Sequence, residues 1–239
     1  MKTVWLHTID STNSEALRRL PELPSGTVLA AYDQTAGRGQ RGNSWFTEPG
    51  RNLTFSIVLK NLPLSALEAI RLNYLASVAV ASFLEGKGVK AHVKWPNDIY
   101  VSGKKISGML IENTLAPDGR LAAAVIGIGL NINQQEFPQL ANATSLACCT
   151  GREYPLEDSL EEFLALFEDL LPGLSSEELR DSYSARLFRR GVSARYHDLL
   201  TDEEFEGIIE GVEADGRLRI RDLRGTARLY RFKEVSYLL

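Results

Sequence analysis

Two charged side chains near the middle of the chain have the types and spacing for phosphate chemistry. Asp98 ends the run Lys-Trp-Pro-Asn-Asp (94–98), and Lys105 follows it in the segment that begins at Gly103. Two strands joined by a short turn would bring this carboxylate and this ammonium together by antiparallel pairing. A lysine can neutralise phosphate or carboxylate oxygens, and an aspartate can hold Mg²⁺. A salt-bridged hairpin without a ligand is the alternative, but the adjacent Trp-Pro-Asn and a nearby arginine loop favour a binding site.

That arginine loop precedes the pair. Positions 37–42 read Gly-Arg-Gly-Gln-Arg-Gly, which matches the dinucleotide pattern G-x-G-x-x-G. The pattern binds a dinucleotide where it opens a helix, whereas here the chain continues through Trp45 into a predicted strand. We therefore reject a Rossmann site, and the sequence contains no Walker A motif. Glycines let backbone N–H groups approach an anion, and two arginines add planar donors. We predict an anion-binding loop that orders on its ligand; a plain surface loop is the alternative.

A third segment combines glycines with an asparagine. Gly127 and Gly129 interrupt an apolar run that ends at Asn131. Glycine weakens a strand, so its presence there indicates a close backbone approach or a bulge. The Asn131 amide both donates and accepts, as the edge of an adenine requires. This pattern is weak evidence when it stands alone.

The elements that must position these residues follow from periodicity and turn signals. A strand at 3–8 leads into a helix whose capping box we assign to Thr12 and Glu15. Apolar patterns predict a long helix at 65–86 and further strands at 27–32, 53–60, 91–94, 99–102, 105–113 and 121–131. Acidic amphipathic helices are expected within 153–181, and short strands with turns after 191 predict a small, separate β-barrel.

Composition and charge limit the class of protein. The 239 residues are 44% hydrophobic and 24% charged, as in ordinary globular proteins, and the net charge of −4 argues against general nucleic-acid binding. The first ten residues lack the apolar core of a signal peptide, and the apolar stretch 72–84 is too short to cross a bilayer. We expect a cytoplasmic protein with no nucleic-acid or membrane partner. The basic stretch 217–233 is either a solvated face or an electrostatic partner site.

Together, the motifs resemble those of biotin protein ligases, the biotin–[acetyl-CoA-carboxylase] ligase family. The matching segments, in chain order, are Asp-Ser-Thr-Asn (10–13), Gln-Thr-Ala-Gly-Arg-Gly (34–39), Lys-Trp-Pro-Asn-Asp (94–98) with 103–108, 127–131, and Ala-Thr-Ser-Leu (143–146). The resemblance implies an α+β catalytic domain over 1–190, with a mixed or antiparallel sheet packed with helices. This is the class II aminoacyl-tRNA synthetase-like biotin/lipoate ligase fold. A small SH3-like β-barrel would occupy 191–239.

The resemblance also implies a two-step reaction. Biotin and Mg·ATP would form biotinyl-5′-AMP and pyrophosphate, and a lysine of a biotin carboxyl carrier protein domain would then take the biotin and release AMP. ATP, Mg²⁺ and biotin would act as substrates and activator, with no tightly bound prosthetic group, in a monomer or weak homodimer. No enzyme nucleophile is needed, because the work is to position two anions and to stabilise charge on the α-phosphate.

The resemblance assigns the site residues by position. Biotin would be bound by Ser11, Thr12, Asn13, Gln34, Arg38, Gly39, Gln40, Lys105 and Gly108. ATP or the adenylate would be bound by Arg38, Arg41, Trp45, Lys94, Asn97, Lys105, Gly127 and Asn131. Catalysis would rest on Lys105, Asp98 and Arg38, with Asp98 as the candidate Mg²⁺ ligand.

The sequence departs from the family pattern in places. The familiar loop reads G-R-G-R-x-G-[RK], so Gln40 and Asn43 leave fewer charges over the phosphates. Only about ten residues precede Asn13, so we expect no helix-turn-helix domain and no DNA-binding repressor activity. A lipoate-type ligase is one alternative, but it would carry an arginine pair followed by a Gly-Gly-Gly run and a histidine, and this motif is missing. The other is a biotin- or carrier-binding module without turnover, which would not need both Asp98 and Lys105.

Overall fold

A seven-stranded mixed sheet forms the centre of the molecule. The computed structural model describes residues 1–138, 140 and 142–238. The strands, in the spatial order β1-β2-β3-β7-β6-β5-β4, are β1 (Lys2–Ile9), β2 (Thr27–Gln34), β3 (Leu53–Lys60), β7 (Leu121–Leu130), β6 (Lys104–Leu115), β5 (Asp98–Val101) and β4 (His92–Lys94). β1 and β2 pair in parallel, and the other neighbours are antiparallel. The strands predicted from the sequence are confirmed, within a few residues at their ends.

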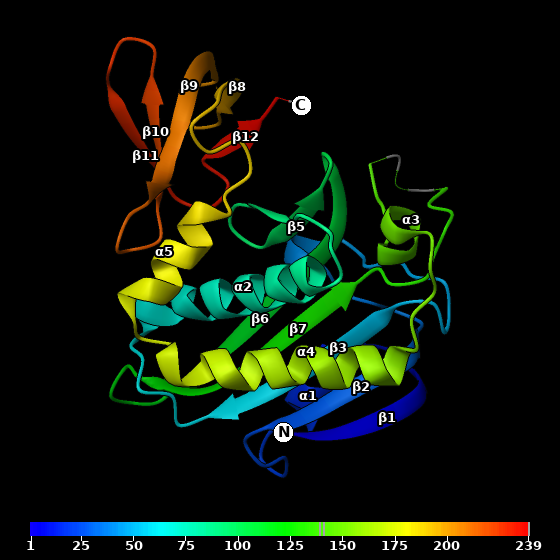
Figure 1. Ribbon diagram of the computed structural model, residues 1–239. Helices are drawn as coiled ribbons and strands as arrows, with labels where there is room; N and C mark the ends of the chain where they lie inside the picture. The colour runs from blue at the N-terminus through cyan, green and yellow to red at the C-terminus, as the bar shows by residue number, and fades with distance from the viewer. Residues whose placement is uncertain (139, 141, 239) are drawn as a thin grey trace.

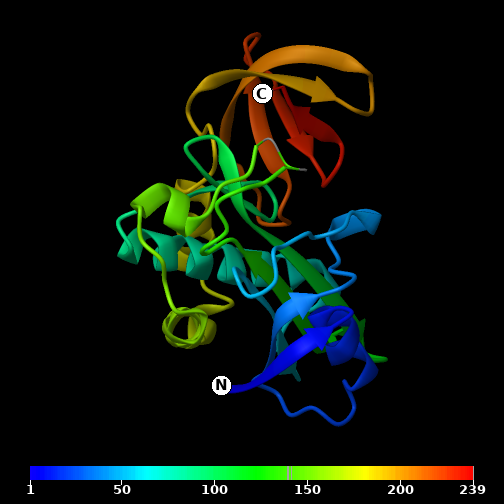
Figure 2. The same ribbon diagram turned by 90° about the vertical axis from the view of Figure 1, so that its right-hand side faces the viewer.

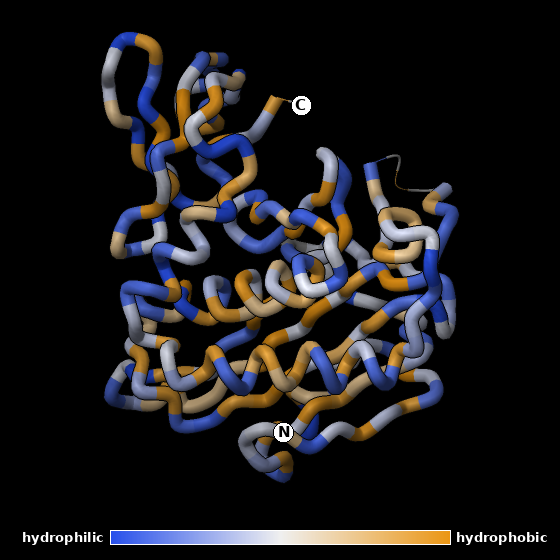
Figure 3. The backbone as a smooth tube through the Cα atoms, viewed as in Figure 1, coloured by the Kyte–Doolittle hydropathy of each residue, from blue (hydrophilic) through white to orange (hydrophobic). Residues whose placement is uncertain are grey.

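Helices cover both faces of this sheet. They are α1 (Thr12–Arg18), α2 (Ile70–Gly86), α3 (Leu146–Thr150), α4 (Leu156–Leu170) and α5 (Glu177–Ala185), with short 3₁₀ turns η1 (Gln40–Gly42), η2 (Ala66–Ala69) and η3 (Leu171–Gly173). α2 and α4 lie side by side on one face, and α1 covers the other (Figures 1 and 2). Apolar residues follow the strands and the inner sides of the helices (Figure 3), and the rings of Phe55 and Phe163 meet in this core at 5.2 Å.

The long helix predicted at 65–86 is found as α2 together with the η2 turn that precedes it. By length and composition, Ala66–Gly86 is the one helical segment among the described residues that could cross a membrane, and it extends beyond the apolar stretch 72–84 at both ends. Of its most apolar window, 61% is buried inside the molecule. α2 is apolar because it packs between the sheet, α4 and α5, as a core helix does.

The first helix begins one residue earlier than predicted. Ser11, not Thr12, is the N-cap residue, and its hydroxyl accepts a hydrogen bond from the Ser14 backbone N–H. The capping box assigned to Thr12 is therefore wrong. Because Ser11 provides the N-cap hydrogen bond, the Thr12 hydroxyl does not have to cap the helix and can bond to other side chains.

A second, five-stranded antiparallel sheet follows α5. Its strands, in the order β11-β10-β9-β8-β12, are β11 (Ala227–Tyr230), β10 (Leu218–Asp222), β9 (Glu203–Val212), β8 (Ser193–Asp198) and β12 (Val235–Tyr237). It lies beyond the β4–β5 end of the large sheet (Figure 1). The Trp95 indole N–H donates to the Gly216 carbonyl at 3.1 Å, and Ile70 closes on Gly216, where φ is +84° and a side chain would be both strained and blocked. These contacts fix one sheet against the other.

The basic stretch of this second sheet is largely neutralised within the molecule. Four of the seven bases in 217–233 pair with acids: Arg217 with Asp215, Arg219 with Glu210 and Glu213, Arg221 with Glu210, and Arg228 with Glu203 and Asp222. Exposed pairs of this kind contribute little stability and leave little net field. Most of the stretch is therefore a solvated, ion-paired face rather than a free basic patch.

Candidate active site

A cavity of about 410 Å³ opens between the two sheets, a volume typical of small-molecule sites. Its walls come from the start of α1, the 37–45 loop, the strands β5, β6 and β7, and the segment from Phe232 to Tyr237. Segments far apart in the sequence thus meet at one site.

One end of the cavity is uncharged and lined by hydrogen-bonding side chains. Gln34, at the end of β2, accepts from the Thr12 backbone N–H at 2.7 Å and from the Thr12 hydroxyl at 3.2 Å. Ser56 of β3 lies behind them, with its Oγ 2.8 Å from Thr12 Oγ1 and 2.6 Å from Asn13 Oδ1. Because the Gln34 carbonyl oxygen is occupied by Thr12, the Gln34 Nε2 amine is the group left to donate toward a ligand.

Asn13 has a different part in this cluster. Its side-chain amine donates to the Leu110 carbonyl at 3.1 Å and to Glu112 at 2.9 Å, and its oxygen faces Ser56. A Cβ atom at Gly127 would overlap the Asn13 oxygen, so this strand carries glycine to admit the amide. Asn13 therefore braces the polar end from behind, and the close approach predicted for Gly127 is found.

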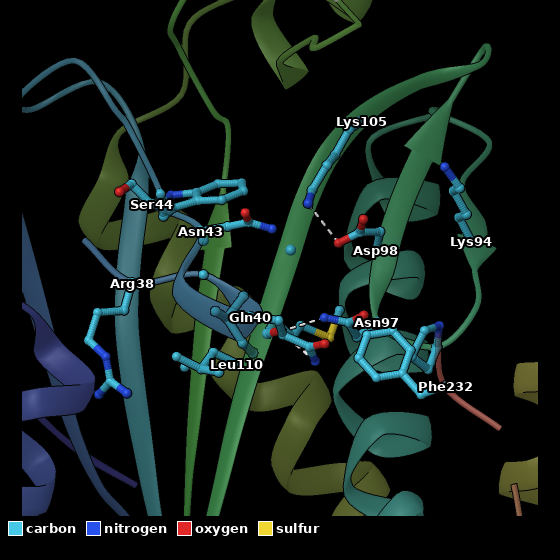
Figure 4. Close-up of a pocket in the computed structure, with 18 of the residues that line it drawn as sticks. Arg38, Gln40, Asn43, Ser44, Lys94, Asn97, Asp98, Lys105, Leu110 and Phe232 are labelled. Carbon is cyan, nitrogen blue, oxygen red and sulfur yellow. Dashed lines mark hydrogen bonds and ion pairs between the residues drawn. The ribbon is translucent and has the colours of Figure 1, made fainter. Parts of the chain in front are cut away.

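The other end of the cavity carries the charged pair. The Lys105 Nζ lies 2.7 Å from Asp98 Oδ1, and both side chains are partly exposed to the cavity (Figure 4). The antiparallel pairing expected from the sequence is confirmed, but its register is irregular. Ile99 pairs with Ser107, whereas Tyr100 pairs with Lys105, so Ile106 is an extra residue in β6. This bulge turns Lys105 onto the face that Asp98 and Gly108 share.

Trp45 packs flat against the floor between the two ends. The Lys105 Nζ is 5.5 Å from the centroid of its ring, close enough for a cation–π contact. A Cβ at Gly129 would overlap the indole, and one at Gly108 would lie 3.2 Å from it, so two glycines make room for the ring. The indole N–H is buried without a hydrogen-bond partner.

The 37–42 loop closes over the cavity as a small ribbon. The Gly39 N–H donates to Asn43 at 2.7 Å, and Arg38 pairs with Ser44. The loop leads through the short η1 turn toward β3 and does not open an α-helix, which confirms that it is not a Rossmann loop. Gln40 points inward, where its amine lies 3.5 Å from the Met109 carbonyl and its oxygen is buried without a partner.

The 37–42 loop carries two arginines, Arg38 and Arg41. The Arg38 guanidinium turns away from the Lys105–Asp98 pair (Figure 4) and pairs with Glu112 at 2.8 Å. The side chain of Arg41 lies outside the described part of the chain, so its predicted role stays a prediction.

Lys94 and Asn97 flank the charged pair. The Lys94 Nζ lies over the rings of Tyr100 and Tyr237, at 5.0 and 5.3 Å, and burial lowers the pKa of this ammonium. Asn97 is buried and donates to the Met109 carbonyl at 2.6 Å, which holds the chain just before Asp98. Both residues line the cavity.

One predicted site residue lies outside the cavity lining. Asn131 is buried, and its amine donates to the Thr144 carbonyl at 2.9 Å. This contact joins the end of β7 to the segment before α3. Asn131 therefore has a part in the fold, and its predicted contact with the nucleotide stays a prediction.

Several lining or supporting residues were missed by the sequence analysis. Ser56 and Glu112 hold the polar end from behind, and Phe232, Lys233 and Tyr237 supply a wall from the second sheet. The described residues contain no group of three metal-ligating side chains, so Asp98 stands as a single carboxylate already paired with Lys105. That arrangement suits a Mg²⁺ ion that arrives with its nucleotide better than a resident metal.

Comparison with known proteins identifies the class. The model of the biotin/lipoate A/B protein ligase family matches residues 5–131, and the chain belongs to this family. The α+β architecture and the small second sheet, which is consistent with a C-terminal barrel, are those of biotin protein ligases.

Three relatives illustrate the similarity. The biotin–[acetyl-CoA-carboxylase] ligase of Paracoccus denitrificans is 32% identical over 229 residues, which cover 90% of this chain and 92% of that protein. The bifunctional ligase/repressor BirA of Bacillus spizizenii is 31% identical over 219 residues, and the chain spans 65% of its length. The solved structure of the biotin protein ligase from Aquifex aeolicus with biotin and ATP superposes with a TM-score of 0.80, at 26% identity over 98% of this chain and 97% of that one.

Proposed function

We propose that this protein is an ATP-dependent biotin protein ligase, which forms biotinyl-5′-AMP and transfers biotin to a lysine of a biotin carboxyl carrier protein domain. The observation that carries the proposal is the polarity of the cavity. A neutral hydrogen-bonding cluster occupies one end, and the Lys105–Asp98 pair occupies the other. This division matches biotin, whose ureido ring is neutral and whose side chain ends in a carboxylate.

The residues of the chain account for the first step by positioning and charge. The Gln34 amine and the Thr12 hydroxyl hold the ureido group, which directs the biotin carboxylate toward Lys105. The carboxylate oxygen attacks the α-phosphorus of Mg·ATP, and pyrophosphate leaves. Lys105 offsets the charge of the two approaching anions. Such fixed donors act where charge develops in the transition state.

The second step needs no further nucleophile from this chain, because the carrier lysine attacks the mixed anhydride and AMP leaves. We assign residues 1–190 to the ligase unit and 191–239 to the small barrel, since the strands of the large sheet end at Leu130 and those of the second begin at Ser193. We locate the reaction in the cytoplasm, in keeping with the burial of the apolar helix α2 in the core.

Release of pyrophosphate from ATP, measured with biotin and without carrier, tests the proposal directly. A biotin ligase releases pyrophosphate until the sites are filled with adenylate, and lipoate does not replace biotin. Release with lipoate alone would favour the lipoate-type ligase. Binding of biotin without any release of pyrophosphate would favour a binding module without turnover.

Ligand binding is expected to protect the 37–42 loop from trypsin. Few side chains of the loop contact the large sheet, and a bound adenylate would give the loop further contacts, among them one to the unpartnered Gln40 oxygen. Cleavage after Arg38 and Arg41 should slow at least about threefold with biotin plus ATP, because a segment must open locally before a protease cuts it. Peptide mapping by mass spectrometry measures this rate. Equal rates with and without ligands would contradict the expectation.

Replacing Lys233 with glutamine is expected to raise the KM for ATP about 3- to 10-fold, with a smaller effect at high salt, because an exposed charge facing an anion is screened. Lys233 lines the cavity, whereas most neighbouring bases are paired with acids. Arg224→Gln, in an exposed turn of the same sheet, is the control and should leave this KM unchanged. An equal change in both variants would contradict a specific role for Lys233.

A further inference from the structure

One carboxylate lies behind both the polar end of the cavity and the loop that covers it. Glu112, on β6, accepts from the Arg38 guanidinium through both oxygens, at 2.8 and 3.1 Å. The same carboxylate accepts from the Asn13 amine at 2.9 Å. Glu112 itself does not line the cavity.

The contact with Asn13 fixes the direction of a buried amide. Asn13 is 3% exposed, and its amine has two acceptors, Glu112 and the Leu110 carbonyl. This leaves the Asn13 oxygen facing Ser56, which in turn lies against Thr12. A charged acceptor makes the stronger hydrogen bond, so Glu112 sets the orientation of the Asn13 amide behind the polar end of the cavity.

The contact with Arg38 holds the loop. Within the ribbon, Gly39 bonds to Asn43 and Arg38 pairs with Ser44, but these contacts join the loop only to itself. Two side-chain hydrogen-bond contacts tie residues 37–42 to β6, namely the Arg38–Glu112 pair and the longer Gln40–Met109 contact at 3.5 Å. A two-pronged arginine–carboxylate pair also fixes direction, which a single contact does not.

We propose that Glu112 is a positioning residue that couples the order of the 37–42 loop to the geometry of the ring-binding end. It does not touch the ligand. One carboxylate orients Asn13 and anchors Arg38. Loss of this carboxylate therefore loosens both the 37–42 loop and the side chains of the polar end of the cavity. This inference deepens the proposed function and rests on it for the identity of the ligand, while the link between Glu112 and the loop stands on the contacts alone.

Hydrogen–deuterium exchange of the ligand-free protein tests the anchor without any appeal to activity. Glu112→Gln keeps an oxygen that can accept from Asn13 but removes the charge that pairs with Arg38. The amides of residues 37–45 are expected to exchange at least about threefold faster in this variant. Glu153→Gln is the matched control, because Glu153 makes a comparable pair with Arg51 at 2.6 Å outside the cavity lining, and its loop exchange should equal that of wild type.

Kinetic measurements test whether Glu112 also affects the polar end of the cavity. Glu112→Gln is expected to raise the KM for biotin about 3- to 10-fold, and Glu112→Ala to raise it further, because Asn13 then loses its acceptor as well. The change in the KM for biotin should exceed the change in kcat at saturating biotin. A purely structural role would instead lower the Tm and leave the KM for biotin unchanged.

A double-mutant cycle with Arg38→Gln completes the test. If Glu112 acts on the loop through Arg38, the loop exchange of Glu112→Gln/Arg38→Gln should match that of the single variants rather than their product. Wild-type exchange and a wild-type KM for biotin in Glu112→Gln would overturn the inference. A wild-type protein that releases no pyrophosphate with biotin would instead refute the proposed function, and the exchange experiment would still decide the role of Glu112.

Discussion

Alanine at position 105 is expected to slow the formation of biotinyl-5′-AMP about 10²- to 10³-fold, the cost of removing one preorganised donor from a developing anion. Lys105 is aimed into the cavity by the bulge at Ile106 and lies 2.7 Å from Asp98. Without its ammonium, the biotin carboxylate and the α-phosphate approach each other unshielded. The loss should fall mainly on kcat for pyrophosphate release, since the charge that Lys105 offsets is greatest in the transition state.

The adjacent residue provides a matched control. Lys104 is exposed at the start of the same strand, so Lys104→Ala removes an equal charge without touching the cavity. It should retain wild-type activity. A Lys105→Ala enzyme within threefold of wild type, or an equal loss in Lys104→Ala, would contradict the role given to Lys105. Unchanged thermal unfolding of both variants would show that the fold is intact.

A single added methyl group at Gly127 is expected to weaken biotin binding nearly as severely. The new Cβ would overlap the Asn13 oxygen, so the amide must turn or the strand must shift. Overpacking of this kind costs about 1–3 kcal/mol, which corresponds to about 5- to 150-fold in the Kd for biotin where the cost falls on the site. Isothermal titration calorimetry with biotin measures the change.

Two further variants separate the clash from general damage. Gly86→Ala adds the same methyl group where no atom lies within 4 Å, at the end of α2, and should leave biotin binding unchanged. Asn13→Ala combined with Gly127→Ala removes the overlapping side chain, so the second substitution should cost much less there than in the wild-type background. Additive losses in the double variant would show that Asn13 is not what Gly127 accommodates.

The sequence predicted the secondary structure well where the signals were local. Alternating apolar residues defined strands such as Leu53–Lys60, and small apolar residues defined the central helix. The start of α1 was misplaced by one residue because Ser11 and Thr12 are both good N-cap residues. The choice between them depends on Gln34 and Ser56, which draw the Thr12 side chain into the cavity and lie far away in the sequence.

The site was predictable in its members more than in its arrangement. The spacing of Asp98 and Lys105 indicated an ion pair, but the bulge that aims Lys105 depends on the register of β5 against β6. The sequence predicted only part of the role of the glycines. Gly127 and Gly129 signalled a close approach, whereas their partners, Asn13 and Trp45, were set by how α1 and the loop pack on the sheet.

Residues that act through tertiary contacts left no signal. Glu112 stands among other polar residues at the end of a strand, and only the pairing of β6 beside α1 brings it to Arg38 and Asn13. For Asn131, the motif suggested a ligand contact, and the structure shows its amine donating to the Thr144 carbonyl where two segments meet. Its predicted contact with the nucleotide stays a prediction.

The contribution of the second sheet to the cavity bears on the order in which the protein matures. The polar end and the charged pair are complete once β7 has been synthesised, but the wall from Phe232 to Tyr237 follows β7 only after the whole second sheet except β12 has been made. The Trp95–Gly216 hydrogen bond that joins the sheets also awaits the late segment. A nascent chain therefore holds the chemical groups of the site well before it holds the enclosure, and it gains the closed cavity only after the second sheet has been synthesised.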